Sequence, residues 1–381
     1  MPFAAALSEH PLPTHAVGEV VGEVLERLGD APDLAVLFVA APHTGAMEDI
    51  AAAVRDLLHP RVLIGCTAGT VVGGEREVED TPAVSLWAGR IPLVEAHRLQ
   101  AVRTPEGAAI TGFPTVDDLP PGAEAILVLA DPFTFPAEEL LVGLREQVGI
   151  HLPVVGGLAS AARGPGGNRI LLDGSIHTDG AVAVVVGGVE VVPVVSQGCR
   201  PIGDPMVVTK GEGTLIHELA GKNALERVQE VLRRLSPDDI ALAQQGLHLG
   251  RVIDERKATF DRGDFLIRNV LGADRSTGAV AVGDEVEVGA TVQLQIRDAD
   301  SADEDLHSLL SGHRADGALL FTCNGRGTHL FGEEDHDARV LGEHLPGVAV
   351  AGMSCAGELG PVGGRSFLHG FTASVLLLRD R

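Results

Sequence analysis

The chain has 381 residues, 45 % of them hydrophobic, which is enough for a globular protein of two or three domains with a substantial core. Its formal charge is −24 and its only lysines, Lys210, Lys222 and Lys257, do not cluster, which argues against binding to nucleic acids or anionic membrane surfaces. No apolar run is long enough to insert into a membrane, and the first residues have no secretory-signal pattern, which predicts a cytoplasmic protein.

The first regular element is expected to be a helix over Val17–Leu28, where apolar residues recur at helical spacing and Gly29 follows as a stop signal. After it, one order of elements occurs three times: an apolar strand, a helix, a second apolar strand, a glycine-rich loop and a third strand. The three segments are Leu34–Trp87, Ala125–Val186 and Ala318–Leu378. The pattern predicts an α/β fold whose mixed sheets are built from repeated β-α-β-loop-β units.

Small residues follow the second strand of every segment, in the stretches Gly65–Gly69, Gly156–Ser160 and Gly352–Glu358. Because glycine permits positive φ and close backbone approach, these stretches suit either tight loops or a ligand cradle. The long loop Ala161–Gly180 is expected to be either a lid or a surface excursion. A polar connection is expected over residues 103–122.

The middle of the chain, residues 189–300, is predicted to be rich in strands. An amphipathic helix over Asn223–Leu235 interrupts the strands, and Ser236 has the character of an N-cap for a second, short helix. We therefore place a domain boundary between Leu235 and Leu247, which gives domains of residues 1–240 and 241–381.

The third segment carries the candidate site. Its first strand ends in the turn Thr322–Gly327 and its second strand in Gly352–Glu358, and parallel strands place their carboxyl ends, where open α/β sheets bind ligands, at one edge. Arg326 and Glu358 are the only charged residues in these stretches and have opposite sign, as a zwitterionic ligand requires. The candidate ligand-binding residues are Thr322, Cys323, Asn324, Arg326, Gly352, Ser354 and Glu358, joined by Cys66, Thr67 and Gly156 from the other loops.

Both charged residues also have a structural alternative. Arg326 either captures a ligand carboxylate or forms a structural ion pair, for example with Glu358. Glu358 either holds a ligand ammonium group or accepts hydrogen bonds from backbone N–H groups. We expect Arg326 to be accessible to solvent, so that Arg326→Ala should remove ligand binding and leave the fold intact.

The four cysteines, Cys66, Cys199, Cys323 and Cys355, have neither close pairing nor the spacing of a zinc site, which predicts reduced thiols and no metal. Cys66 and Cys323 are candidate nucleophiles or thiolate ligands, although small buried cysteines at strand ends are the commoner case. The sequence requires no cofactor.

Short motifs spread over nearly the whole chain, in a fixed order, resemble the FIST family. The FIST N domain is resembled by Gly65–Gly69, Pro153–Gly157, Gln197–Gly203 and Gly221–Leu225, and the FIST C domain by Leu320–Gly327 and Gly357–Gly360. The chain departs from the family pattern at Gly69-Thr70, where Gly-Glu is frequent.

The resemblance implies an intracellular sensory module that binds a small ligand such as an amino acid, and some members of the family are linked to haem and gas sensing. The sequence contains no kinase, cyclase or methyl-acceptor region, so its output is expected to pass through a separately encoded signalling protein. The leading hypothesis is a sensor without catalysis. The alternatives are a cysteine-dependent enzyme centred on Cys323, with Arg326 stabilising an anion, and a haem-binding gas sensor.

Overall fold

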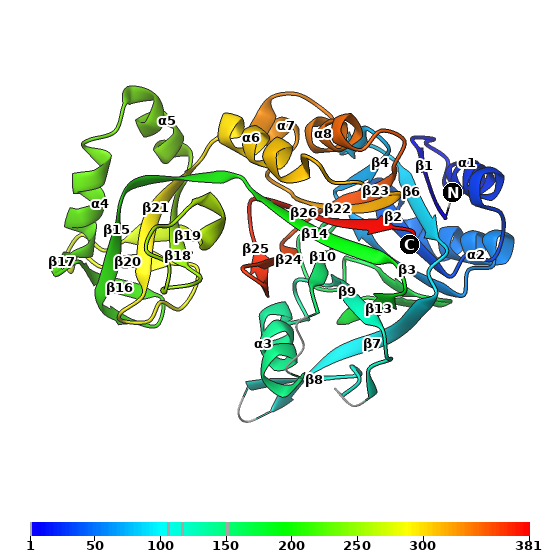
Figure 1. Cartoon of the computed structure of the whole chain (residues 1–381), viewed down its shortest axis with the longest axis horizontal. Helices are drawn as coiled ribbons and strands as arrows, with labels where there is room; N and C mark the ends of the chain where they lie inside the picture. The colour runs from blue at the N-terminus through cyan, green and yellow to red at the C-terminus, as the bar shows by residue number, and fades with distance from the viewer. Residues whose placement is uncertain (1, 105–106, 116–117, 149–151) are drawn as a thin grey trace. The chain divides into compact units, whose positions relative to one another are not determined.

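The computed structural model describes residues 2–104, 107–115, 118–148 and 152–381 (Figure 1). The chain has the α/β fold that its sequence predicts, and it divides into two compact units. Unit 1 contains the residues up to Val195 together with Leu306–Leu368 and Thr372–Arg381, and unit 2 contains Ser196–Asp305 and His369–Phe371. The boundary expected near residue 240 lies within unit 2 and stays a prediction.

The three repeated segments are present in unit 1 and have the same strand order. In each segment the second strand pairs in parallel with the first, and the third strand pairs antiparallel on the other side of the first. The predicted repeat is therefore confirmed. The first strand, helix, second strand and third strand are β2 (Leu34–Ala40), α2 (Met47–Leu58), β3 (Val62–Ala68) and β6 (Val84–Gly89); β9 (Ala123–Ala130), α3 (Ala137–Val148), β10 (Val154–Leu158) and β13 (Ala181–Gly187); and β22 (Gly317–Cys323), α8 (His336–His344), β23 (Ala349–Cys355) and β26 (Thr372–Arg379).

A hairpin that the sequence did not predict precedes the third strand of each segment, and it joins the sheet of another segment. The strand β4 pairs with β23, β11 pairs with β3, and β24 pairs with β10. The segments are thus interlocked in a ring. The hairpins are β4 (Thr70–Gly73) with β5 (Arg76–Glu79), β11 (Ile170–Leu172) with β12 (Ser175–His177), and β24 (Glu358–Val362) with β25 (Arg365–His369).

The loop expected over Ala161–Gly180 as a lid or surface excursion therefore contains a hairpin built into a sheet. One further strand lies beside the third strand of each segment, namely β1 (Phe3–Ser8), β7 (Leu93–Thr104) and β14 (Glu190–Gln197). The strand β8 (Gly107–Thr111) extends the second sheet beyond β7. Residues 105–106 and 116–117 of the predicted polar connection lie outside the described residues.

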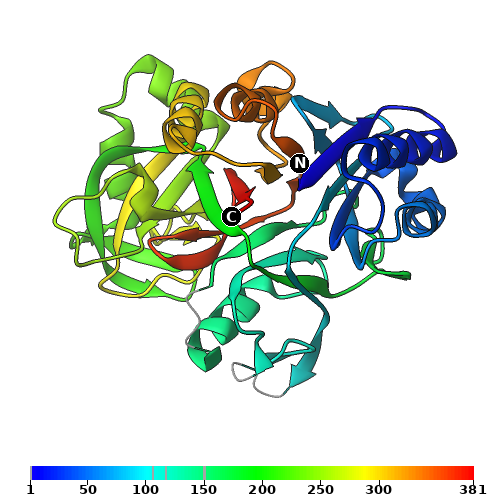
Figure 2. The same ribbon diagram turned by 45° about the vertical axis from the view of Figure 1, so that its right-hand side comes forward.

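One face of each of these three sheets contributes to a common hydrophobic core, as the alternation of side chains along a strand requires. In β2, for example, Val36 and Phe38 enter this core, whereas Leu37 packs on the opposite face. Helices cover the opposite faces: α1 (Pro13–Leu28) and α2, which lie side by side in Figures 1 and 2, then α3, and then α8 with Leu306 and Leu310 of α6 (Ala299–Leu310).

The stretches expected to be glycine-rich loops begin inside strands, which corrects that prediction. Residues 65–68, 156–158 and 352–355 form the carboxyl-terminal parts of β3, β10 and β23. A Cβ atom at Gly65, Gly156 or Gly352 would stand 2.2, 1.9 or 2.0 Å from a carbonyl oxygen of the preceding parallel strand. Glycine is needed there because the two backbones approach closely, so the strand packing accounts for these three glycines without a ligand.

Unit 2 contains the predicted strand-rich middle of the chain as a closed barrel. Its strands follow the order β15, β21, β18, β19, β20 and β16, and pairing of β15 with β16 closes the ring. They are β15 (Cys199–Glu212), β16 (Leu215–Leu219), β18 (Leu247–Val252), β19 (Phe265–Ala273), β20 (Val280–Val282) and β21 (Thr291–Arg297), with β17 (Lys222–Asn223) beside β16.

Both predicted helices of unit 2 are present. Ser236 is the N-cap that was expected, whereas Asn223, expected as the first residue of its helix, is the N-cap of that helix. Asn223 Oδ1 accepts the N–H groups of Leu225 and Glu226 at the start of α4 (Ala224–Leu232), and Ser236 Oγ accepts the Asp239 N–H at the start of α5 (Pro237–Gln245). Shorter helical turns are η1 (Ala41–Ala46), η3 (Arg262–Asp264) and α7 (Thr328–Phe331). Over the described ranges, no helix has both the length and the apolar character needed to cross a bilayer.

Candidate functional site

Arg326 is buried in the third segment, which corrects the expectation of a solvent-accessible side chain. Only 2 % of the residue is exposed. Its guanidinium makes a bidentate ion pair with Asp337 at the start of α8, with Nε 2.7 Å from Oδ2 and Nη2 2.8 Å from Oδ1. The structural alternative foreseen for Arg326 is therefore realised, but with Asp337 as the partner instead of Glu358.

The Asp337 carboxylate accepts further hydrogen bonds. Thr322 Oγ1 donates to Oδ2 at 2.6 Å, and His336 Nδ1 lies 3.0 Å from Oδ1. Burial alone would raise the pKa of Asp337, but the charge of Arg326 and these hydrogen bonds hold it below its usual value. Asp337 is therefore ionised at neutral pH and balances the charge of Arg326.

Aromatic packing closes one side of this ion pair. The ring of Phe331 stacks on His336 with centroids 3.4 Å apart, and the guanidinium carbon of Arg326 lies 5.2 Å from the Phe331 centroid. Such packing excludes water, so the Arg326–Asp337 pair lies in surroundings of low polarity.

Glu358, the first residue of β24, is fully buried as well. Its Oε2 atom accepts hydrogen bonds from the backbone N–H and the hydroxyl of Thr372, at 3.2 and 2.9 Å. Burial raises the pKa of Glu358 to about 8, and the contacts with Thr372 offset this only in part. At neutral pH most of the Glu358 carboxyl groups are therefore protonated.

Two buried polar atoms of this cluster have no hydrogen-bond partner among the described residues: Arg326 Nη1 and Glu358 Oε1. An unsatisfied buried polar group costs about 1–3 kcal/mol, so proteins rarely retain one without a reason. One atom is a donor and the other belongs to a carboxyl group, so together they can complement a small polar ligand.

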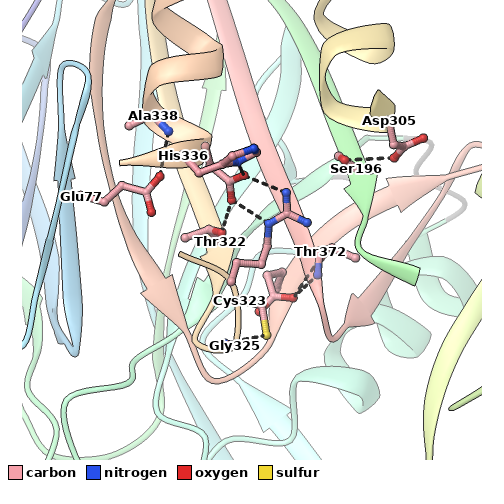
Figure 3. Close-up of polar contacts among 12 residues, drawn as sticks. Glu77, Ser196, Asp305, Thr322, Cys323, Gly325, His336, Ala338 and Thr372 are labelled. Carbon is pink, nitrogen blue, oxygen red and sulfur yellow. Dashed lines mark hydrogen bonds and ion pairs between the residues drawn. The ribbon is translucent and has the colours of Figure 1, made fainter. Parts of the chain in front are cut away.

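A second buried carboxyl group reaches the cluster from the first segment. Glu77 lies on β5, which belongs to the third sheet through the hairpin exchange, and its Oε1 accepts the Ala338 N–H at 2.8 Å (Figure 3). Burial, followed by the charge of Asp337, raises the pKa of Glu77 to about 8. Glu77 accepts a hydrogen bond at the start of α8, where the first N–H groups of a helix lack partners within the helix. Glu358 has no such role at a helix start.

The structure brings the predicted turn and the end of β23 together. Cys323 pairs in register with Cys355, and the Asn324 N–H donates to the Cys355 carbonyl oxygen. Figure 3 shows Thr322, Cys323, His336 and Thr372 gathered around the polar contacts of this region.

The remaining candidate residues have structural contacts where the three segments meet. The Cys66 thiol donates to Met353 Sδ at 3.1 Å, Thr67 Oγ1 accepts the Arg169 N–H, and Ser354 Oγ accepts the Thr70 N–H. Burial raises the pKa values of the Cys66 and Cys355 thiols, which keeps both protonated at neutral pH.

Apart from Glu77, the residues of the polar cluster lie in the third segment. The strand residue that pairs with the close-approach glycine is hydrophobic in every hairpin: Val72, Leu171 and Leu359. The residue before it is Val71 in the first hairpin and Ile170 in the second, but Glu358 in the third. A buried carboxyl group thus occupies a position that apolar side chains fill in the sister segments, as expected of a site grafted onto a repeated scaffold.

Among the residues that the structure gathers here, Thr322, Cys323, Arg326 and Glu358 were candidates from the sequence. Four others were not candidates, namely Glu77, His336, Asp337 and Thr372. The sequence did contain a signal for Asp337. It is an acidic residue in the first turn of α8 and follows Arg326 closely in the chain, with only α7 between them, so it was available as an ion-pair partner. Glu77 had none, because only the hairpin exchange brings it to this sheet.

Among the described residues, hollows lie away from this cluster. One of about 340 Å³ is polar and lies on unit 1, lined by His313, Arg314, Ala315, Asp316, His344, Leu345, Pro346 and Arg379. One of about 410 Å³ lies on unit 2 between α4 and α5. Across the ranges that the structure describes, no group of three or more His, Cys, Asp or Glu side chains is arranged to hold a metal ion.

Comparisons with known proteins identify the family. A FIST N domain matches residues 33–222 and a FIST C domain matches residues 224–361. An uncharacterized protein of Mycobacterium bovis is 46 % identical over 379 residues, covering 96 % of this chain and 95 % of that protein. An uncharacterized protein of Mycobacterium tuberculosis is 43 % identical over 393 residues and is covered completely, as is this chain. The chain therefore belongs to the FIST family, whose domains are generally small-ligand sensory domains of signal transduction.

Proposed function

We propose that this protein is a cytoplasmic sensor that binds a small polar ligand between Arg326 and Glu358. The observation that carries the proposal is the pair of buried, unpartnered atoms, Arg326 Nη1 and Glu358 Oε1, in the one segment where a carboxyl group replaces an apolar residue. The two atoms differ in polarity, and a ligand that hydrogen bonds to both would remove the cost of leaving them unsatisfied.

The hydrogen-bonding groups of Arg326 and Glu358 that have no partner in the protein indicate the class of ligand. Asp337 takes the Nε and Nη2 side of the guanidinium, which leaves the N–H groups of Arg326 Nη1 to donate to a ligand oxygen. Glu358 can accept a hydrogen bond from a ligand N–H or ammonium group. An amino acid or a related metabolite meets both requirements.

The proton on Glu358 distinguishes a zwitterionic ligand from a neutral one. Because the pKa of Glu358 is about 8, this carboxyl is mostly protonated at pH 7. A ligand ammonium group favours the ionised form, so amino-acid binding should release a proton, whereas a neutral ligand should release none. Titration calorimetry in two buffers of different ionisation enthalpy measures this proton directly.

The experiment begins with a thermal-shift screen of amino acids and related metabolites, because a ligand that binds only the native state raises its stability. Each compound that raises the melting temperature is then titrated into Glu358→Gln and into Glu77→Gln, the matched control. Glu77 has a similar pKa and burial but its Oε1 already accepts the Ala338 N–H. We expect weaker binding to Glu358→Gln only. If both variants bound the compound with equal affinity, the ligand-binding site would not lie at Glu358.

The proposal includes an output through a separately encoded signalling protein and a location in the cytoplasm. Four cysteines without a disulfide support a reducing compartment. Co-purification from cells grown with and without the ligand tests this output. Binding of a signalling partner should depend on the ligand, whereas binding of a permanent subunit should not.

A further inference from the structure

Two of the four cysteines face one another across neighbouring strands. Cys323 on β22 and Cys355 on β23 are directly paired in the parallel register. Adjacent strands lie about 4.7–4.9 Å apart, which falls inside the Cα–Cα range of about 4.4–6.8 Å over which a disulfide forms. Phe321 and Met353, two residues earlier on each strand, both enter the common core, so the two cysteines lie on the same face of the sheet.

The two thiols differ in accessibility. Cys323 is partly exposed at the end of its strand, whereas Cys355 is buried, and so are Cys66 and Cys199. A reagent from solvent therefore reaches Cys323 first, and Cys355 is the thiol that stands beside it.

Two groups near Cys323 interact favourably with a negative charge on its sulfur. The Gly325 N–H donates to Cys323 Sγ at 3.5 Å, a contact drawn in Figure 3. The Arg326 guanidinium interacts favourably with a negative charge on this sulfur and is fully buried. Its Nη1 atom, without a partner among the described residues, is a donor for an oxygen that approaches the sulfur. Glu358, also fully buried, adds the unpartnered Oε1.

We propose that Cys323 and Cys355 form a thiol pair that reacts with hydroperoxides. The Cys323 sulfur attacks one oxygen of the hydroperoxide, and the O–O bond breaks. The sulfur is oxidised to a sulfenic acid, and the peroxide is reduced to an alcohol or water. The thiol proton passes to the leaving oxygen by way of the Glu358 carboxyl, which hydrogen bonds with the Cys323 side chain. The Cys355 thiol then displaces the hydroxyl group of the sulfenic acid, which yields a Cys323–Cys355 disulfide and one water.

This reaction goes beyond the proposed function, and its test requires no ligand. The full-length protein, fully reduced, is treated with a small molar excess of hydrogen peroxide, and its thiols are counted and mapped by mass spectrometry. We expect the thiol count to fall from four to two, with a single cross-linked peptide that joins Cys323 to Cys355. A dithiol reductant should restore all four thiols.

Variants separate the two steps. In Cys355→Ala the sulfenic acid cannot be resolved, so dimedone should label Cys323 and leave Cys66 and Cys199 unlabelled. In Cys323→Ala peroxide should leave Cys355 reduced, and the control Cys199→Ala should behave as the unaltered protein. Native Cys323 should react about tenfold or more faster than Cys199. Equal loss of all four thiols, persistence of all four, or cross-links between molecules instead of Cys323–Cys355 would overturn the proposal.

Discussion

Removal of the Arg326 guanidinium should strongly destabilise unit 1. In Arg326→Met the Asp337 carboxylate stays fully buried and loses two charge-assisted hydrogen bonds, although Thr322 and His336 still contact it. Removing one partner of a buried ion pair costs about 3–5 kcal/mol, because an uncompensated charge remains. The entropy of unfolding is about 2.1 cal/mol/K per residue, so a unit of roughly 270 residues loses about 1.8 °C of melting temperature per kcal/mol, and the drop should reach at least about 5 °C.

The control lies on the same helix. Arg339 of α8 pairs with Glu333 at the surface, where both side chains are about half exposed, so Arg339→Met should cost no more than about 1 kcal/mol. The double variant Arg326→Met/Asp337→Leu removes both buried charges and should be less destabilised than the sum of its single changes.

Differential scanning calorimetry of the four proteins measures these effects. If Arg326→Met melted no lower than Arg339→Met, the buried ion pair would not stabilise the fold and the burial argument would fail.

Three further predictions follow from the same structure. Because the folded pKa values of Glu77 and Glu358, about 8, exceed their unfolded value of 4.5, their contribution to stability is complete below pH 4.5 and is lost as pH rises toward 8. Each carboxyl should lower the unfolding free energy by up to about 1.4 kcal/mol per pH unit in that window, and urea titrations of Glu358→Gln should show a shallower decline than the unaltered protein. Gly65→Ala should destabilise more than Gly18→Ala, since its Cβ would stand 2.2 Å from a carbonyl oxygen whereas nothing lies within 4 Å at Gly18; equal melting temperatures would contradict this. Thiol titration of the denatured protein, purified without oxidant, should find four reduced cysteines, and a stable disulfide would refute the assignment of a reducing compartment.

The repeated elements could be predicted because their signals are local. A run such as Leu34–Ala40 has the length of a buried strand, and Met47–Leu58 has helical spacing, and the structure has β2 and α2 over these residues. The glycines of Gly65, Gly156 and Gly352 were misinterpreted as loops, because a sequence does not distinguish a glycine that admits a ligand from one that admits a neighbouring backbone.

The hairpin exchange could not be predicted, since pairing between β4 and β23 joins residues about 280 positions apart and has no local signature. The candidate site could be predicted only in part for the same reason, because it depends on contacts between distant parts of the chain. Arg326 and Glu358 were found from charge and position, but the hydrogen-bonding capacity that Asp337 takes from Arg326 depends on how α8 docks on the sheet.

The central claim is that a small polar ligand binds between Arg326 and Glu358. The most direct measurement is a crystal structure of the protein with a compound that raises its melting temperature. The account predicts a ligand oxygen about 2.7–3.2 Å from Arg326 Nη1 and a ligand hydrogen-bond donor at the same distance from Glu358 Oε1. A ligand bound in the polar hollow lined by His313 and Arg379, or against the loop Ala161–Gly180, with both buried atoms left unpartnered, would contradict it.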